Sequence, residues 1–270
     1  MVQGYDTEEQ KERVLLVGVQ LDNQEDMESS LEELKALAKT AGAETVGKVI
    51  QPRDAYHPAT YIGKGKLEEV RSLIEETGAT GIICDDELSP AQLRNLEDAL
   101  GTKVMDRTMV ILDIFASRAT TSEGKIQVEV AQLKYRSTRL TGLGTTLKDL
   151  EEIKNHREVA RQNRSRTAVP VAAIVGYTNA GKSTLLNYMT DAGILSEDKL
   201  FATLDPTTRA MNLPNGEKIL LTDTVGFIRK LPHNLIEAFK STLEEAKYAD
   251  IIVHVVDASS PDRDIQMDVV

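Results

Sequence analysis

Short apolar runs alternate with amphipathic stretches along the first half of the chain. Four of these runs are typical of buried strands, at residues 13–20 (RVLLVGVQ), 43–50, 79–86 and 102–107. Three stretches between them place apolar residues at helical spacing, at residues 27–38, 66–78 and 89–101. Because strands that alternate with helices tend to pair in parallel, we expect an α/β domain with a parallel sheet.

The pattern becomes largely helical from Thr108 onward. Apolar positions up to Gly142 predict a helical extension of this domain that is broken near residues 122–124. Residues 148–166 (KDLEEIKNHREVARQNRSR) carry too few apolar positions for a core helix. We therefore expect a surface helix that connects two domains.

A second α/β unit is predicted from residue 168 onward. Buried strands are expected at 169–175, 217–224 and 249–259, with helices from Lys182 and at 233–248. The chain ends inside what looks like the start of another helix. The predicted organisation is an N-terminal α/β domain with its helical extension (1–133), a basic helical connector (134–167) and a second α/β domain (168–270).

Composition narrows the class of protein. A chain of 270 residues is long enough for about two domains, and 41% hydrophobic with 28% charged residues is typical of a globular protein. Scarce aromatic residues count against a surface that stacks nucleic acid bases. Cys84 is the single cysteine, and no apolar stretch approaches the ~18 residues of a membrane span. We expect a cytoplasmic protein that requires no membrane.

Charge is unevenly distributed along the chain. The net charge of −11 argues against attraction of the whole surface to nucleic acid. Residues 134–166 nevertheless carry nine Lys or Arg against four acidic residues. This basic segment is either a local contact for RNA or a solvated helix between two domains, and the sequence leaves both interpretations open.

The second α/β unit contains a glycine-containing loop with a phosphate-binding motif. "GYTNAGKST" fits G-x-x-x-x-G-K-[ST] from Gly176 to Ser183, with a predicted strand before it and a predicted helix after it. Backbone N–H groups of such a loop bind phosphate, Lys182 would contact the β- and γ-phosphates, and Ser183 would bind Mg²⁺. A chance match is the alternative, and the strand–loop–helix context disfavours it.

Two further segments supply the other parts of a nucleotide site. Asp223 ends an apolar strand, as expected of a carboxylate that holds Mg²⁺ through water, and Gly226 would offer its N–H to the γ-phosphate. Between this segment and the loop lies "KLFATLDPTTR" (199–209), in which a threonine would close over the γ-phosphate and Mg²⁺. On chemistry alone, Thr203, Thr207 and Thr208 all qualify.

Phe227 stands where several nucleotide hydrolases have a water-orienting glutamine. A phenylalanine side chain has no donor or acceptor, so it cannot orient water. Slow basal hydrolysis is therefore expected, with water positioned by backbone groups of the switch segments or by a group that a partner supplies.

Several of these motifs resemble those of one family. "GYTNAGKST", "FATLDPTTR" and "DTVGFIRKLPHNLIEAFKSTLEEA" are similar to the HflX family, in the Obg–HflX group of P-loop GTPases, as are "HPATYIGKGKLEEV" and "RLTGLGT" upstream. The resemblance covers most of the chain from about Arg13. It implies a GTPase with Mg²⁺ as cofactor, GTP as substrate and GDP as product, and Thr203 as the switch threonine on Mg²⁺.

The resemblance also implies a partner and a set of site residues. The partner is the large ribosomal subunit, its rRNA and proteins, which would stimulate hydrolysis by a monomer that splits or rescues stalled ribosomes. The catalytic residues would be Lys182, Thr203 and Gly226, and the metal ligands Ser183, Thr203 and Asp223. The nucleotide-binding residues would be Gly176, Tyr177, Thr178, Asn179, Ala180, Gly181, Lys182, Ser183, Thr184, Phe201, Ala202, Thr203, Leu204, Asp205, Asp223, Thr224, Val225 and Gly226.

This sequence departs from the family's pattern in two places. The glycine-rich loop and longer helical hairpin expected after "RLTGLGT" are missing, and no N-K-x-D element that reads guanine follows Val256. The expected fold is thus an N-terminal α/β domain with a parallel sheet and helical extension, followed by a P-loop GTPase domain truncated at its C-terminus. An Obg-like GTPase of ribosome assembly, a non-catalytic RNA-binding module with a vestigial nucleotide domain, and an ATPase remain alternatives.

Three smaller features have ordinary interpretations. The loop at residues 63–66 could hold an RNA phosphate or be a turn with solvated lysines. The acidic strand end at residues 85–87 is explained by a solvated loop. His254, inside an apolar run, is expected to be a core residue rather than a catalyst.

Overall fold

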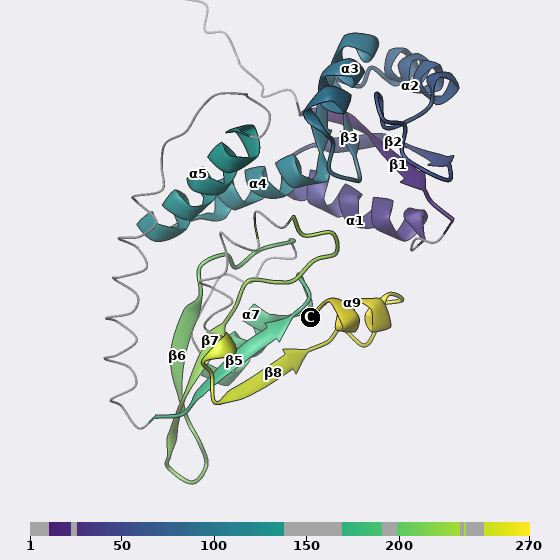
Figure 1. Ribbon diagram of the computed structural model, residues 1–270. Helices are drawn as coiled ribbons and strands as arrows, with labels where there is room; N and C mark the ends of the chain where they lie inside the picture. The colour runs from purple at the N-terminus through teal and green to yellow at the C-terminus, as the bar shows by residue number, and fades with distance from the viewer. Residues whose placement is uncertain (1–10, 23–25, 138–168, 191–198, 233–234, 236–245) are drawn as a thin grey trace, which may run out of the picture. The chain divides into compact units, whose positions relative to one another are not determined.

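The computed structural model describes residues 11–22, 26–137, 169–190, 199–232, 235 and 246–270 (Figure 1). The chain divides into two compact units, Met1–Ile111 and Leu112–Val270. Within these described residues, each unit contains one sheet of four strands. None of the helices in the described part of the chain is long and apolar enough to cross a membrane.

The first unit is built on a parallel sheet with the strand order β2-β1-β3-β4. Its strands are β1 (Arg13–Gln20), β2 (Glu44–Pro52), β3 (Gly81–Cys84) and β4 (Lys103–Asp106). The register sets Val17 beside Cys84 and Cys84 beside Asp106. The predicted parallel α/β arrangement is therefore confirmed.

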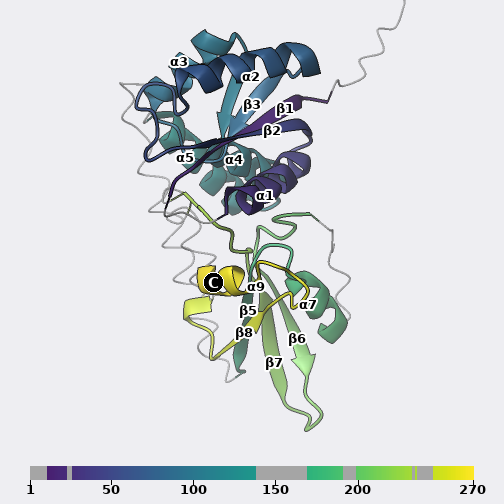
Figure 2. The ribbon, with the colours of Figure 1, turned by 90° about the vertical axis from the view of Figure 1, so that its right-hand side faces the viewer.

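Helices cover both faces of this sheet. Helix α1 (Met27–Thr40) packs on one face, while α2 (Lys64–Thr77) and α3 (Pro90–Leu100) lie side by side on the other (Figure 2). Ser89 begins α3 with a capping box, in which its side chain accepts from Gln92 N and the Gln92 side chain accepts from Ser89 N. These exchanged hydrogen bonds satisfy backbone donors that the helix leaves unpaired, so the helix starts at this point.

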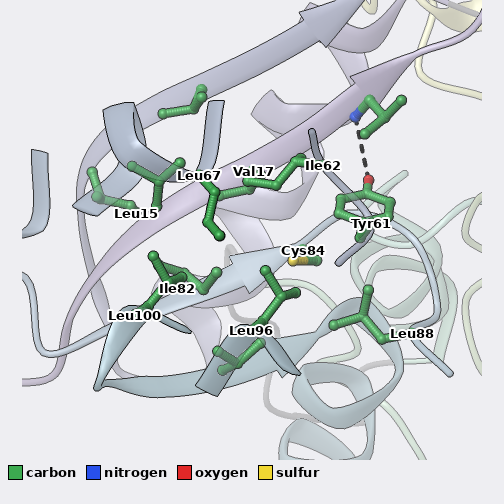
Figure 3. Close-up of a cluster of buried hydrophobic side chains, with 14 of the residues drawn as sticks. Leu15, Val17, Tyr61, Ile62, Leu67, Ile82, Cys84, Leu88, Leu96 and Leu100 are labelled. Atoms are coloured by element: carbon green, nitrogen blue, oxygen red, sulfur yellow. Dashed lines mark hydrogen bonds between the residues drawn. The ribbon is translucent and has the colours of Figure 1, made fainter. Parts of the chain in front are cut away.

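One hydrophobic cluster of the first unit lies between the sheet and the α2/α3 layer (Figure 3). One residue in it, Tyr61, is polar at its tip: its hydroxyl accepts from Val19 N (3.2 Å) and donates to Asp86 Oδ2 (2.6 Å). The hydroxyl thus joins β1 to the loop after β3. Strand order reverses between β1 and β3, and α/β sheets bind ligands at such a point. Here Tyr61 takes part of that space.

A buried ion cluster lies at the end of β3 and corrects one expectation. Asp85, expected in a solvated loop, is fully buried. Its carboxylate accepts from Arg107 Nη1 (2.9 Å) and from Ser30 Oγ (2.7 Å), and Arg107 also pairs with Glu33. Because α1 and the residue after β4 bring these donors to the end of β3, the acidic residue can be buried without an unpaired charge.

Two helices follow the first sheet. Helix α4 (Arg107–Arg118) and helix α5 (Ser122–Ser137) are separated by residues 119–121, just before the break expected near residues 122–124. Beyond Ser137, the predicted connector (134–167) lies outside the described residues. The boundaries at 133/134 and 167/168 remain predictions.

The sheet of the second unit has the order β6-β7-β5-β8. Strands β7 (Lys218–Asp223), β5 (Val171–Gly176) and β8 (Ile251–Val255) are parallel, and β6 (Thr207–Asn212) runs antiparallel to β7, with Thr207 beside Asp223. The sequence did not predict β6. Helices α7 (Lys182–Thr190) and α9 (Arg263–Val269) complete the described elements.

Two expectations in this unit need comment. The predicted helix at 233–248 lies mostly outside the described residues. His254, expected in the core, is exposed. Strand β8 is the last in the strand order of this sheet, and Ile251 and Ile252 beside His254 are also about half exposed, at 48% and 52%. An apolar run therefore did not imply burial on both faces at this strand.

Candidate nucleotide-binding site

The loop at residues 176–183 leaves the carboxyl end of β5 and leads into α7. Its backbone turns through positive φ at Asn179 (61°) and Gly181 (93°), and loops with such turns are typical of phosphate-binding sites. Lys182 is buried and donates its ammonium to Tyr177 O at 2.8 Å. Burial lowers the pKa of Lys182 to about 8, although the nearby Asp223 carboxylate acts in the opposite direction.

Three oxygen-bearing side chains meet at the start of α7. Ser183 Oγ lies 2.7 Å from Thr203 Oγ1 and donates to Asp223 Oδ2 at 2.6 Å. The other carboxylate oxygen, Asp223 Oδ1, is buried and has no hydrogen-bond partner among the described residues. Burial raises the pKa of Asp223, against the lowering effects of the Ser183 hydrogen bond and the Lys182 charge.

These donors fit a magnesium ion. Mg²⁺ prefers hard oxygen ligands. A buried carboxylate oxygen without a hydrogen-bond donor has lost its contacts with water, and a bound cation compensates for that loss. No cluster of three or more His, Cys, Asp or Glu suited to a metal occurs in the described part of the chain. A set of two hydroxyls and one carboxylate therefore fits Mg²⁺ better than a zinc-type site.

The structure distinguishes among the three candidate threonines of the segment 199–209. Thr203 meets Ser183, whereas Thr207 and Thr208 begin strand β6, and Thr208 Oγ1 lies 2.9 Å from Thr222 Oγ1. The loop is also fixed at Phe201, whose N–H donates to Thr178 Oγ1 at 2.8 Å. Thr203 is therefore the threonine that the fold brings to Ser183.

The segment after β7 lies directly on the phosphate-binding loop. Thr178 N donates to Phe227 O at 2.7 Å, and Phe227 N donates to Gly176 O at 3.1 Å. A Cβ on Gly226 would lie 2.6 Å from Thr178 Cα, so this close approach requires glycine. The Phe227 ring is half-buried. Its backbone, rather than its side chain, makes the contacts with the loop.

Most of the predicted site residues line one pocket. The lining residues are Thr178, Asn179, Gly181, Lys182, Ser183, Thr184, Lys199, Phe201, Ala202, Thr203, Thr224 and Gly226. Lys199 was not predicted, although a basic residue at the start of the switch segment was a signal for it.

Seven predicted residues do not line this pocket: Gly176, Tyr177, Ala180, Leu204, Asp205, Asp223 and Val225. Two of them point elsewhere. The Tyr177 hydroxyl accepts from Arg229 N at 2.8 Å, and the Asp205 carboxylate accepts from Thr120 and Thr121. Asp223 reaches the pocket through Ser183.

Comparison with known families matches three consecutive segments of the chain. Residues 28–116 match the family described as GTP-binding GTPase N-terminal, and residues 118–149 match GTP-binding GTPase Middle Region. Residues 171–269, which include the pocket, match the family described as 50S ribosome-binding GTPase.

Among solved structures, the complex of SsGBP with GDP is similar to this chain. It is 28% identical, with 96% of this chain and 76% of that chain covered and a TM-score of 0.51. This likeness supports the α/β fold of the chain.

Several curated relatives are closer in sequence. GTPase HflX of Lacrimispora saccharolytica is 62% identical over 302 positions, covering 100% of this chain and 71% of the relative. GTPase HflX of Caldanaerobacter subterraneus is 52% identical (96% of this chain, 68% of the relative), and that of Escherichia coli is 42% identical (94% and 67%). The first alignment is longer than the 270 residues of this chain, so that relative carries residues that this chain lacks inside the matched region. The chain belongs to the HflX family of GTPases.

Proposed function

We propose that this chain binds GTP together with Mg²⁺ and hydrolyses it slowly, and that the large ribosomal subunit is the partner that accelerates the reaction. The observation that carries the proposal is the meeting of Ser183, Thr203 and Asp223 beside the phosphate-binding loop, with Asp223 Oδ1 left without a donor among the described residues. A triphosphate with its cation supplies the missing charge.

Each part of the site has a role in this proposal. Backbone N–H groups of residues 181–183 bind the phosphates, and the Lys182 ammonium exchanges Tyr177 O for phosphate oxygens, which restores the solvation it loses by burial. Gly226 N–H binds the γ-phosphate. Ser183 and Thr203 would hold Mg²⁺, with Asp223 bound to it through water, and the ion would neutralise charge on the β- and γ-phosphates.

With Phe227 at this position, the site has no side chain there that can orient the attacking water. The Phe227 side chain cannot hydrogen-bond water, and its N–H is already bonded to Gly176 O in this structure. We expect slow unstimulated turnover, with the water positioned by switch backbone groups or by the partner. Stimulated turnover should survive Phe227→Ala, and fast turnover of the unmodified chain without a partner would contradict this expectation.

Nucleotide binding is tested with a fluorescent GTP analogue. Binding should require Mg²⁺ and be lost in Lys182→Ala, while Lys218→Ala, which removes an exposed lysine of β7, should bind like the unmodified chain. Competition by ATP against GTP measures the choice of base. Binding that is unaffected by Lys182→Ala would favour the alternative of a non-catalytic RNA-binding module.

The proposal that the ribosome is the partner is supported by the similarity to GTPase HflX relatives and by the match to the 50S ribosome-binding GTPase family. We propose a cytoplasmic monomer whose triphosphate form binds the large subunit and splits or rescues stalled ribosomes. Co-sedimentation with isolated large subunits should be stronger with a GTP analogue than with GDP. Equal pelleting with both nucleotides would refute a nucleotide-controlled ribosome partner.

A further inference from the structure

The loop at residues 201–205, which carries Thr203, is also bonded to the start of helix α5 through Asp205. Both segments belong to the second unit (Leu112–Val270). Asp205 Oδ2 accepts from Thr120 N (3.1 Å), Thr120 Oγ1 (2.7 Å) and Thr121 N (3.0 Å), and Asp205 Oδ1 accepts from Thr121 Oγ1 (2.7 Å). Hydrogen bonds to an ionised acceptor are among the stronger ones in proteins, and here four of them fix one side chain.

The same contact holds the first turn of α5. Thr121 Oγ1 accepts from Gly124 N at 2.9 Å, and Thr121 O accepts from Lys125 N at 3.0 Å, so Thr121 caps the helix. Asp205 in turn binds the hydroxyl and the N–H of this capping residue. Its negative charge lies at a helix N-terminus, where the helix dipole favours it. The loop and the helix start therefore stabilise each other.

Close packing gives independent support for this contact. A Cβ on Gly124 would lie 2.4 Å from Asp205 Oδ1 and 3.0 Å from Thr121 Oγ1, so a larger residue at this position would displace the carboxylate. The other end of the loop is held against α4, because the Phe201 and Phe115 rings meet edge to face with their centroids 4.6 Å apart. Both ends of the Thr203 loop thus contact the helical segment.

We infer that Asp205 is a positioning residue for GTP hydrolysis, which holds Thr203 at Ser183 and Asp223 by anchoring its loop on the N-terminus of α5. This inference rests on the function proposed above. Thr203 and Asp205 are two residues apart, so the anchored carboxylate confines Thr203 to within about 7 Å of the Asp205 position. Because coupling between two sites is reciprocal, a partner that moves α5 also changes how well Thr203 is held.

The test compares affinity for a non-hydrolysable GTP analogue with affinity for GDP, both with Mg²⁺. Only the triphosphate state uses Thr203 on the γ-phosphate side of the ion. Asp205→Ala should weaken binding of the GTP analogue and lower kcat by about tenfold, the factor expected for one charge-assisted hydrogen bond, with GDP affinity changed less than about twofold. Asp205→Asn keeps one acceptor oxygen, so its affinity for the GTP analogue and its kcat should lie between those of Asp205→Ala and of the unmodified chain.

Gly124→Ala is the second, independent variant, because it removes the contact sterically and leaves the loop sequence intact. It should shift the ratio of GTP-analogue to GDP affinity in the same direction as Asp205→Ala. In both variants the Thr120 and Thr121 N–H groups should exchange with deuterium faster than in the unmodified chain. Two controls, Glu129→Ala on the exposed face of α5 and Asp268→Asn on α9, should leave the ratio unchanged.

The outcomes separate this inference from the proposed function. If Lys182→Ala abolishes nucleotide binding while Asp205→Ala and Gly124→Ala keep the unmodified ratio, the inference is overturned and the proposed function stands. If Lys182→Ala binds normally, the proposed function fails and the inference falls with it. Circular dichroism checks folding, and if Asp205→Ala does not fold, Asp205→Asn and Gly124→Ala decide the question.

Discussion

Replacing Gly226 with alanine should detach the segment after β7 from the phosphate-binding loop. The added Cβ would lie 2.6 Å from Thr178 Cα, 2.9 Å from Thr178 Cβ and 3.0 Å from Lys182 Nζ. The first two neighbours belong to the loop and its side-chain root, which cannot rotate away as a flexible side chain can. The backbone around residue 226 must therefore move outward.

The size of the effect follows from the bonds that this movement breaks. Thr178 N→Phe227 O (2.7 Å) and Phe227 N→Gly176 O (3.1 Å) hold the two segments together. At a net ~0.5–1.5 kcal/mol for each hydrogen bond, their loss costs about 1–3 kcal/mol, which is also the usual range for an overpacked site.

Urea unfolding followed by circular dichroism measures this cost, and hydrogen exchange locates it. The Thr178 and Phe227 N–H groups should exchange faster in Gly226→Ala, roughly tenfold or more if at least 1.4 kcal/mol is lost. Gly65→Ala is the matched control, since its Cβ would meet nothing within 4 Å and it lies in α2, where alanine should add about 0.5–1 kcal/mol. An unfolding free energy unchanged to within about 0.5 kcal/mol, with unchanged exchange at both groups, would refute the steric argument.

Three further predictions concern the first unit. Arg107→Met leaves Asp85 buried without its ion pair and should lower the free energy of unfolding by about 3–5 kcal/mol, whereas Lys103→Met, which breaks a half-exposed pair with Glu12, should cost at most about 1 kcal/mol in the same urea titration. Ser89→Ala removes the capping box of α3 and should cost about 1 kcal/mol, with a loss below about 0.3 kcal/mol contradicting the assignment. Burial, with Asp106, Asp86 and Asp85 nearby, raises the pKa of the Cys84 thiol, so a thiol reagent should label one cysteine only after unfolding, and labelling of the folded chain would show the site to be accessible.

Apolar periodicity predicted the elements that are buried on a regular face. The strands of the first sheet and the three helices between them were expected, because their patterns are local and each agrees with the fold around it. The phosphate-binding loop was predictable for the same reason, since its spacing and its strand–helix context lie within one short segment.

The features that were missed depend on contacts between distant segments. Burial of Asp85 requires Arg107 and Ser30 from other elements, and exposure of His254 requires that no further strand of the described sheet follow β8. Neither the contacts of Asp85 nor the position of β8 in the sheet can be predicted from the local sequence pattern. Strand β6 differs, because Asn215-Gly216 between two strand-like runs is a local hairpin signal that the sequence does contain.

The choice of Thr203 also needed tertiary contact. Three threonines in one segment are equivalent in chemistry, and only the strand pairing that draws Thr207 and Thr208 into β6 separates them. The hydrogen bonds of Asp205 to Thr120 and Thr121 join residues about 85 positions apart in sequence, so no periodicity could indicate them.

The β6–β7 hairpin sets a rule for how this region can change in length. Its ladder runs from Thr207 beside Asp223 to Asn212 beside Lys218, and the turn between them is closed by Leu213 N→Glu217 O at 2.8 Å. Because strand side chains alternate with a period of two, a deletion of one residue from β6 would move the preceding loop by about 3.4 Å and invert the faces of the strand. Residues added in pairs, one to each strand next to the turn, would leave the opposite end in place. Insertions should therefore be tolerated at residues 213–217, while the spacing from Thr203 to Thr207 should tolerate none.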